Sequence, residues 1–149
     1  MKKFKLIFII VLVATTFVMC NKDEINVAPG ITAAEVNNAF IDGNWRVTSF
    51  NEAGEDHTSN LSGYNFTFKD NGNILSALDT IGKWSTTPES DIAIMMLDFT
   101  RDSIKTDIDS IGKNWSILAL TPQFVPTKIE MKRVDEDDAS IDFLTFEKF

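Results

Sequence analysis

The sequence predicts an all-β domain, an eight-stranded antiparallel up-and-down barrel preceded by a short helix. Two observations predict this fold. From residue 44 onward, apolar and polar residues alternate in short stretches, and turn residues separate these stretches at regular spacing. Eight short strands can close into a barrel that holds side chains or one small ligand, and closure removes the strand edges that promote aggregation.

The first 19 residues predict a signal peptide that is absent from the mature chain. A basic start with Lys2, Lys3 and Lys5 precedes 14 uncharged residues, 6–19. A membrane-spanning helix needs about 20 apolar residues, so this run is too short to cross a bilayer. A basic start followed by an apolar run of this length is typical of a secretory signal.

Cys20, the only cysteine in the chain, stands where the apolar run ends. A disulfide within the chain is therefore excluded. Residues 17–20, Phe-Val-Met-Cys, resemble the lipobox of bacterial lipoproteins, although Met19 stands where a small residue is usual. The resemblance implies that Cys20 is acylated, becomes the first residue and attaches the protein to a lipid leaflet. The alternative is an unmodified thiol.

Residues 21–24, Asn-Lys-Asp-Glu, resemble the export signal of Bacteroidetes surface lipoproteins. The resemblance implies a lipid-anchored protein of the outer membrane that is exposed at the cell surface. The alternative is a solvated tether without an address. In either case residues 20–31 form a tether that ends near Pro29-Gly30, and residues 32–149 form the domain.

The mature chain is strongly acidic. Without the signal peptide, 11 basic residues stand against 22 acidic ones, a formal charge of −11. Such a field repels nucleic-acid phosphates and anionic lipid headgroups, so nucleic-acid binding is excluded as a function class. We expect a monomer whose membrane partner is the leaflet that holds acylated Cys20.

A capping box opens the one predicted helix, at residues 33–41. Thr32 supplies the N-cap hydroxyl and Glu35 stands three residues later. Val36 and Phe40 lie on one face of this helix, and Gly43 follows as the residue that ends it.

Eight stretches rich in β-branched and aromatic residues are the predicted strands. They cover residues 45–50, 64–68, 74–78, 81–86, 92–99, 115–120, 128–133 and 141–148. Asn71-Gly72 predicts a tight hairpin turn. Residues 101–112 are polar without alternation, which predicts a long loop with at most a helical turn. The strand at 92–99 is apolar on both faces and should be covered on both.

Alternation also predicts which side chains share the inner face of the sheet. The inward-facing set is Tyr64, Phe66 and Phe68, then Ile92, Ile94 and Met96, then Trp115, Ile117 and Ala119, and finally Ile129 and Met131.

Gly43-Asn44-Trp45, directly after the helix, resembles the G-x-W motif of lipocalins. With residues 62–74, 82–85 and 144–149, it makes residues 41–149 similar to the lipocalin-like domains of Bacteroidetes lipoproteins. The resemblance implies an up-and-down barrel with the tryptophan packed across its base and, in lipocalins proper, an apolar cavity. Four features depart from lipocalins. The chain ends on a strand, and the late arginine that stacks on the tryptophan has no clear counterpart, Arg133 being the only late arginine. The usual disulfide is absent, and the domain is short.

Two functions of different class follow. In the first, the barrel binds a small apolar ligand and residues 99–112 form a cover. The candidate lining residues are Trp45, Tyr64, Phe66, Phe68, Trp84, Ile94, Met96, Ile117 and Met131. In the second, the barrel is filled by its own side chains and its surface binds a protein or a glycan.

Catalysis and cofactors find little support in the sequence. His57 is the only histidine and lies in a polar stretch between the first two predicted strands. A zinc site needs three or four nitrogen or sulfur ligands, which this chain cannot supply. The acidic turn at residues 135–138 lacks the spacing of an EF-hand loop, and we interpret it as a solvated hairpin tip. We expect neither an enzyme nor a bound metal or cofactor.

Overall fold

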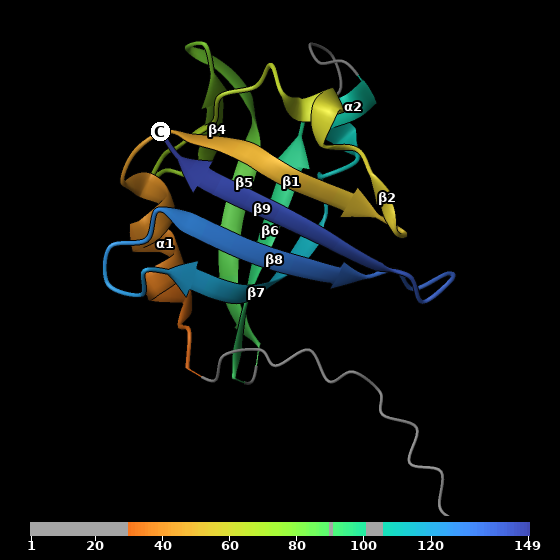
Figure 1. Ribbon diagram of the computed structural model, residues 1–149. Coiled ribbons are helices and arrows are strands. Elements are labelled where there is room, and N and C mark those ends of the chain that lie inside the picture. The colour runs from red at the N-terminus through yellow and green to blue at the C-terminus, as the bar shows by residue number, and fades with distance from the viewer. Residues whose placement is uncertain (1–29, 90, 101–105) are drawn as a thin grey trace, which may run out of the picture.

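The computed structural model describes residues 30–89, 91–100 and 106–149 (Figure 1). The predicted signal peptide, Cys20 and nearly all of the predicted tether lie outside these residues. The described part forms one antiparallel sheet of nine strands with a short helix, so the prediction of an all-β domain with an N-terminal helix is confirmed. The strands are β1 (Trp45–Glu52), β2 (Glu55–Asp56), β3 (Thr67–Phe68), β4 (Asn73–Ser76), β5 (Asp79–Glu89), β6 (Ile92–Phe99), β7 (Asn114–Thr121), β8 (Lys128–Val134) and β9 (Ile141–Lys148).

The helix α1 (Ala33–Ile41) has the predicted bounds and the predicted cap. The Glu35 amide donates to the Thr32 hydroxyl over 3.2 Å, and the Thr32 amide donates to the Glu35 carboxylate over 2.8 Å. This reciprocal pair satisfies two backbone donors that the first turn otherwise leaves open. Val36 and Phe40, on one face, are fully buried, as their spacing predicted.

Strands that follow one another in the chain pair as antiparallel neighbours, except β2 and β3. The strand order in the sheet is β2-β1-β9-β8-β7-β6-β5-β4-β3. The last strand, β9, returns to pair with β1, and the sheet curls so that β4, β5 and β6 lie behind β1, β8 and β9 (Figure 1). All eight predicted strands are present. The ninth, β2, is a two-residue return that pairs with the end of β1.

A single backbone bridge links β1 to the segment just before β3. Trp45 and Phe66 exchange two backbone hydrogen bonds of 2.8 and 2.7 Å. Beside them, the Thr67 hydroxyl donates to the Asn44 side chain over 2.7 Å. The start of β1, the second strand in the pairing order, is therefore in contact with the segment that leads into β3, the last strand of that order.

The predicted inner face of β6 was wrong. Burial alternates on the other set, with Met95 and Leu97 inside, whereas Ile94 is half-buried and Met96 is 44% exposed on the outer surface. Directly paired residues of neighbouring strands point to the same side, and Met95 pairs with the buried Trp115. Because this strand is apolar on both faces, alternation alone could not choose between them.

A bulge in β7 changes the predicted face at the end of that strand. Trp115 and Ile117 are buried as predicted, but the pairing with β8 shifts between Ile117 and Ala119. The extra residue moves the inward position by one, so Leu120 is buried and Ala119 is not.

Each end of the curled sheet is covered by a different set of segments. At the α1 end, Phe40 enters the interior from the helix. At the opposite end, which we call the far end, lie the 3-10 turn η1 (Thr58–Leu61) and the single turn α2 (Thr106–Asp109) (Figure 1). Leu61 of η1, Ile108 of α2 and the nearby Ile111 are fully buried on the inner side of this second cover.

Candidate functional site

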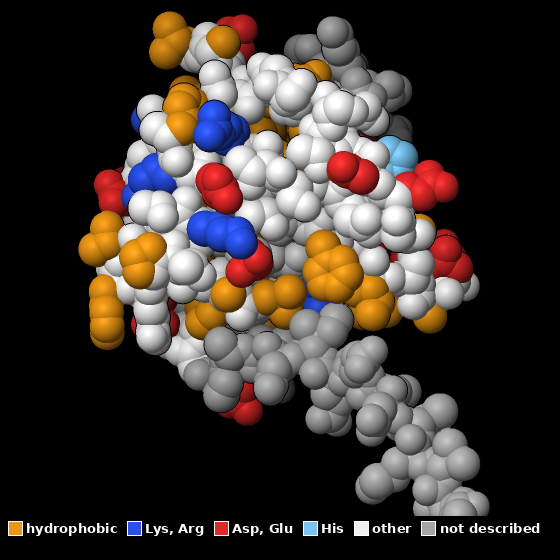
Figure 2. Space-filling model, viewed as in Figure 1, with side chains coloured by type: hydrophobic (Ala, Val, Ile, Leu, Met, Phe, Trp, Pro, Cys, Tyr) orange, Lys and Arg blue, Asp and Glu red, His pale blue; other side chains and the backbone are white. Residues whose placement is uncertain are grey.

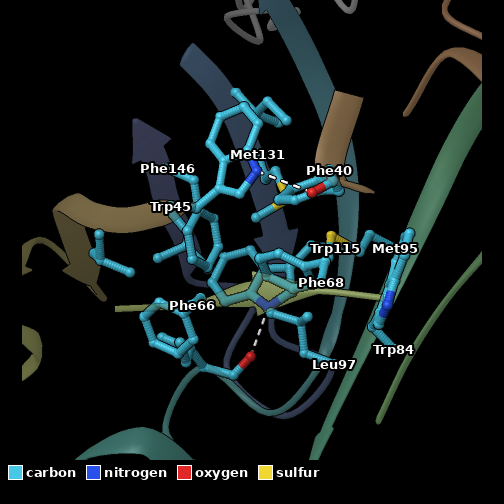
Figure 3. Packing of buried hydrophobic residues seen from close by; sticks show 14 of the residues in the cluster. Phe40, Trp45, Phe66, Phe68, Trp84, Met95, Leu97, Trp115, Met131 and Phe146 are labelled. Atoms are coloured by element: carbon cyan, nitrogen blue, oxygen red, sulfur yellow. Dashed lines mark hydrogen bonds between the residues drawn. The ribbon is translucent and has the colours of Figure 1, made fainter. Parts of the chain in front are cut away.

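Most of the predicted lining residues belong to a packed aromatic core. Trp45, Phe66, Phe68, Ile117 and Met131 are all buried. The Phe66 and Phe146 ring centroids lie 5.4 Å apart, and those of Phe68 and Trp84 lie 5.5 Å apart. The labelled side chains point toward one another rather than around an open space (Figure 3).

Phe40 is the core residue that links the helix to this cluster. Its ring lies 4.6 Å from Phe68, 5.3 Å from Trp45 and 5.8 Å from Phe146, measured between centroids. The sequence predicted that Phe40 shares one face of the helix with Val36, but not what Phe40 packs against. Phe40 occupies the α1 end of the interior and closes the aromatic cluster there.

The three tryptophans each tie a neighbouring segment to the sheet through the indole N–H. Trp45 donates to the Phe40 carbonyl over 3.0 Å, and Trp115 donates to the Ile111 carbonyl over 2.9 Å (Figure 3). Trp84 donates to the Lys69 carbonyl over 2.9 Å. Buried indole N–H groups need hydrogen-bond partners, so these bonds hold the helix, the loop before β7 and the β3–β4 turn against the sheet.

Lys148 is the basic residue that lies over the ring of Trp45. Its ammonium lies 5.3 Å from the Trp45 ring centroid and 3.1 Å from an oxygen of Asp42. Gly43, between these two partners, has φ +119°, and a Cβ there would lie 3.1 Å from the Lys148 side chain. In the Gly-Asn-Trp motif, the Trp45 ring and the missing side chain of Gly43 thus leave room for the Lys148 stem. Arg133, the only late arginine, pairs with Asp142 and Asp135 instead.

Of the predicted lining residues, Trp84 is the one that borders a surface groove between α1 and the sheet. The groove has a volume of about 390 Å³. Its walls come from α1, from the β3–β4 turn and from β5. The lining residues are Asn37, Ile41, Asp70, Asn71, Gly72, Trp84, Ser85 and Thr86.

Polar groups on three separate elements converge on this groove. The Thr86 hydroxyl donates to the Asn37 side-chain oxygen over 2.7 Å. This bond uses the oxygen of the Asn37 amide and leaves its NH₂ group available as a donor. The Asn71 side-chain oxygen accepts from the Asn73 amide over 3.1 Å. Within the described part of the chain, no hydrogen bond engages the Asn37 or Asn71 NH₂ group or the Asp70 carboxylate. The groove therefore combines amide donors, one carboxylate, hydroxyls and apolar edges.

The remaining predicted lining residues lie outside this groove. Tyr64 is half-buried and stacks on Phe66, with ring centroids 6.3 Å apart. Ile94 and Met96 lie on the outer surface of β6. These positions do not form one site, since they are distributed over the core and two separate surfaces.

A charged cluster occupies the far end. Arg133 donates two hydrogen bonds to the buried Asp142, over 3.0 and 2.6 Å, and one to Asp135 over 2.7 Å. The other Asp142 oxygen accepts from the Ala53 amide over 3.0 Å. Partial burial lowers the pKa of the Arg133 guanidinium, but the hydrogen bonds and charges of the two aspartates raise this pKa by more.

In the acidic turn, the carboxylates of Asp135 and Asp138 accept hydrogen bonds from backbone amides of the same hairpin. Asp135 accepts from the Asp137 amide over 2.9 Å, and this bond, with the one from Arg133, lowers its pKa. Asp138 accepts from the Ser140 amide over 2.8 Å, which lowers its pKa. Among the described residues, no three His, Cys, Asp or Glu side chains are grouped as metal ligands. His57 lies 3.8 Å from the exposed Glu55 carboxylate.

The chain matches no protein-family model, no curated protein and no solved structure. In the described part of the chain, no helix has the length and apolar character needed to cross a membrane.

Proposed function

We propose that this chain is a lipid-anchored protein of the cell envelope, held by acylated Cys20, whose filled β-barrel binds a glycan in the groove between α1 and β5. The observation that carries the proposal is this groove, in which polar groups without a hydrogen-bond partner among the described residues lie beside apolar side chains. The interior is a packed core in this proposal, so the apolar-ligand function gives way to surface binding.

Closure of the sheet into a barrel is supported by the Trp45–Phe66 bridge. Two backbone hydrogen bonds join β1, second in the pairing order, to the segment just before β3, the last strand, and the Thr67–Asn44 side-chain bond extends the contact. In a closed sheet the inner face has no access except through its ends. The burial of Phe40 at one end, and of Ile108 and Ile111 at the other, supports a filled interior.

The composition of the groove favours a neutral, hydroxyl-rich ligand over a charged one. Asn side chains both donate and accept, and Ser and Thr hydroxyls do the same, which suits the mixed donors and acceptors of a sugar. Asp70 supplies the only formal charge among the lining residues. The volume of about 390 Å³ falls in the range of small-molecule sites, roughly 300–1,000 Å³.

A glycan array followed by calorimetry of its best hit tests this function. Asn37→Ala and Asn71→Ala should each weaken binding about tenfold, because each removes amide hydrogen bonds worth about 0.5–1.5 kcal/mol. Asn38→Ala is the matched control, since Asn38 lies on the same helix but borders a different groove. Binding that is absent, or that Asn38→Ala weakens as much, would contradict the proposed site.

The anchor is tested separately from the groove. Cys20→Ala should move the protein from the membrane fraction to the soluble fraction, because the acyl chains then have no attachment point. A protein that stays in the membrane fraction would overturn the proposed anchor while leaving the groove untouched.

A further inference from the structure

An apolar loop tip at the α1 end stands out from the surface. In the loop between β7 and β8, Phe124 is 95% exposed and Val125 is 64% exposed. Apolar side chains gather over this loop at the left edge of Figure 2. Adjacent apolar side chains that are this exposed leave apolar surface in water without a partner, and such a patch indicates a contact site.

The loop is held at its base, so the tip projects in a defined direction. The Thr127 amide donates to the Thr121 carbonyl over 2.9 Å, and the Lys148 amide donates to the Thr127 carbonyl over 2.8 Å. Behind the tip, a groove of about 320 Å³ separates the loop from α1 and is lined in part by Glu35 and Asp42. Phe124 is therefore presented outward and does not fold back into the core.

The tether leaves the domain at this same end. Residues 30–33 line a depression together with Pro88, Asp91 and Ile92, which places the start of α1 beside the β5–β6 turn. That turn, the β7–β8 loop and the last residue, Phe149, all lie where strands arrive at the α1 end (Figure 1). Phe149 is itself 57% exposed.

The length of the tether limits how far this end can lie from a lipid surface. From Cys20 to Gly30 the chain makes ten steps, which span at most about 36 Å. A domain of this size is roughly 35 Å across. An anchored domain therefore stays within about one diameter of the leaflet, with the α1 end attached to the tether.

We infer that the tip formed by Phe124 and Val125 inserts into the interface of the lipid leaflet that holds Cys20, and so orients the domain. This inference rests on the proposed acylation of Cys20. The occupant is a zwitterionic lipid surface, because Glu35 and Asp42 beside the loop and the acidic net charge disfavour anionic headgroups. The acyl chains on Cys20 hold the protein at the leaflet, and the loop adds a second contact that sets the orientation of the domain.

Because acylation blocks the Cys20 thiol, a new cysteine can be labelled alone. Full-length Val125→Cys, purified with its anchor, is labelled with the fluorophore NBD and reconstituted into phosphatidylcholine vesicles. The matched control is Leu78→Cys, in the β4–β5 turn, which is also an exposed apolar residue, at 92%. Leu78 lies one strand length from the tether exit, about 33 Å along β5.

The expected result is a blue shift of the NBD emission and quenching by doxyl-labelled lipid at position 125, with neither effect at position 78. Adding Phe124→Asp to Val125→Cys should abolish both effects while the protein still floats with the vesicles. Vesicle flotation without a difference between positions 125 and 78 would overturn the docking inference and leave the anchor intact. Failure to float, or NBD labelling of the parent chain at Cys20, would overturn the anchor and the docking together.

Discussion

The two ends of the curled sheet are covered by different chemistry. At the α1 end a helix delivers Phe40 into a cluster of aromatic rings, and Lys148 lies over Trp45. At the far end the cover is made of aliphatic side chains, and the rim beside it is an ion-paired cluster centred on Asp142. The proposed ligand groove, the tether and the exposed Phe124 all belong to the α1 end.

The difference separates two ways of stabilising the end of a sheet. Aromatic burial contributes through apolar area and ring packing, and it needs no charge. A buried carboxylate contributes only while its partners are present, because an unpaired buried charge is strongly unfavourable. We therefore expect the α1 end to respond mainly to changes of side-chain volume and the far end to changes of charge.

The largest expected effect is the loss of the ring at Phe40. Phe40→Ala should lower the free energy of unfolding by about 3–5 kcal/mol, because it leaves a cavity among four aromatic rings. Urea denaturation followed by tryptophan fluorescence measures this change. Phe149→Ala, at the same end but on the surface, should change stability by no more than about 0.5 kcal/mol. Equal effects of the two substitutions would refute the role of Phe40 as the internal cover.

At the far end the corresponding substitution is Asp142→Ala. It leaves the Arg133 guanidinium with one partner and the Ala53 amide with none, and should cost about 2–3 kcal/mol. Asp135→Ala should cost less, because Arg133 keeps its contact with the buried Asp142. If thermal denaturation shows a larger loss of stability for Asp135→Ala than for Asp142→Ala, the cluster is not organised around the buried carboxylate.

A smaller effect is expected for Lys148→Met at the α1 end. The substitution keeps the stem over Gly43 but removes the charge over the Trp45 ring and beside Asp42, and should cost about 1 kcal/mol. Lys148→Arg should retain most of the stability, since a guanidinium also stacks on an indole. Chemical denaturation at low and at 1 M salt separates the two contributions, because the exposed Asp42 pair is screened.

The smallest expected effect is a loss of stability at acidic pH. The Glu35 carboxylate accepts hydrogen bonds from the Thr32 amide and hydroxyl, which lower its pKa below the ordinary 4.5. The Asp135 carboxylate accepts hydrogen bonds from the Asp137 amide and from Arg133, which lower its pKa below the ordinary 3.8. A carboxylate with a lowered folded-state pKa stabilises the fold above its ordinary pKa and loses that contribution as the pH falls through the folded value.

Stability should therefore be flat above about pH 5 and decline below it. Glu35→Gln should flatten part of that decline by removing the α1 contribution, and Asp135→Asn should do so at the far end. Denaturation midpoints measured from pH 6 to pH 3 test both variants. A decline that neither substitution reduces would assign acid sensitivity to other carboxylates.

The elements with local signals were predictable from the sequence. The capping box of Thr32 and Glu35 gave α1 its exact bounds, and the Asn-Gly turn placed the β3–β4 hairpin. The inner face of β6 was not predictable, because both of its faces are apolar and only pairing with Trp115 selects Met95 over Met96.

Less of the candidate site than of the fold could be predicted from the sequence. Of its lining residues only Trp84 was predicted to line a site, whereas Asn71 and Gly72 were predicted only as a turn. Asn37 and Thr86 carry no motif and meet through tertiary contacts. Lys148 was missed for a related reason: its partners, Asp42 and Trp45, lie more than 100 residues away in the sequence.

The central claim, that the chain fills its own interior, is tested most directly by titrating the fluorescent fatty acid cis-parinaric acid into the protein. We predict no saturable binding to the parent chain, because the rings of Phe40, Phe66, Phe68 and Phe146 pack against one another in its interior. Phe146→Ala should bind benzene in the small apolar cavity that it opens, but still not the fatty acid. Saturable binding of one fatty acid per parent chain would contradict the claim and restore the hollow barrel.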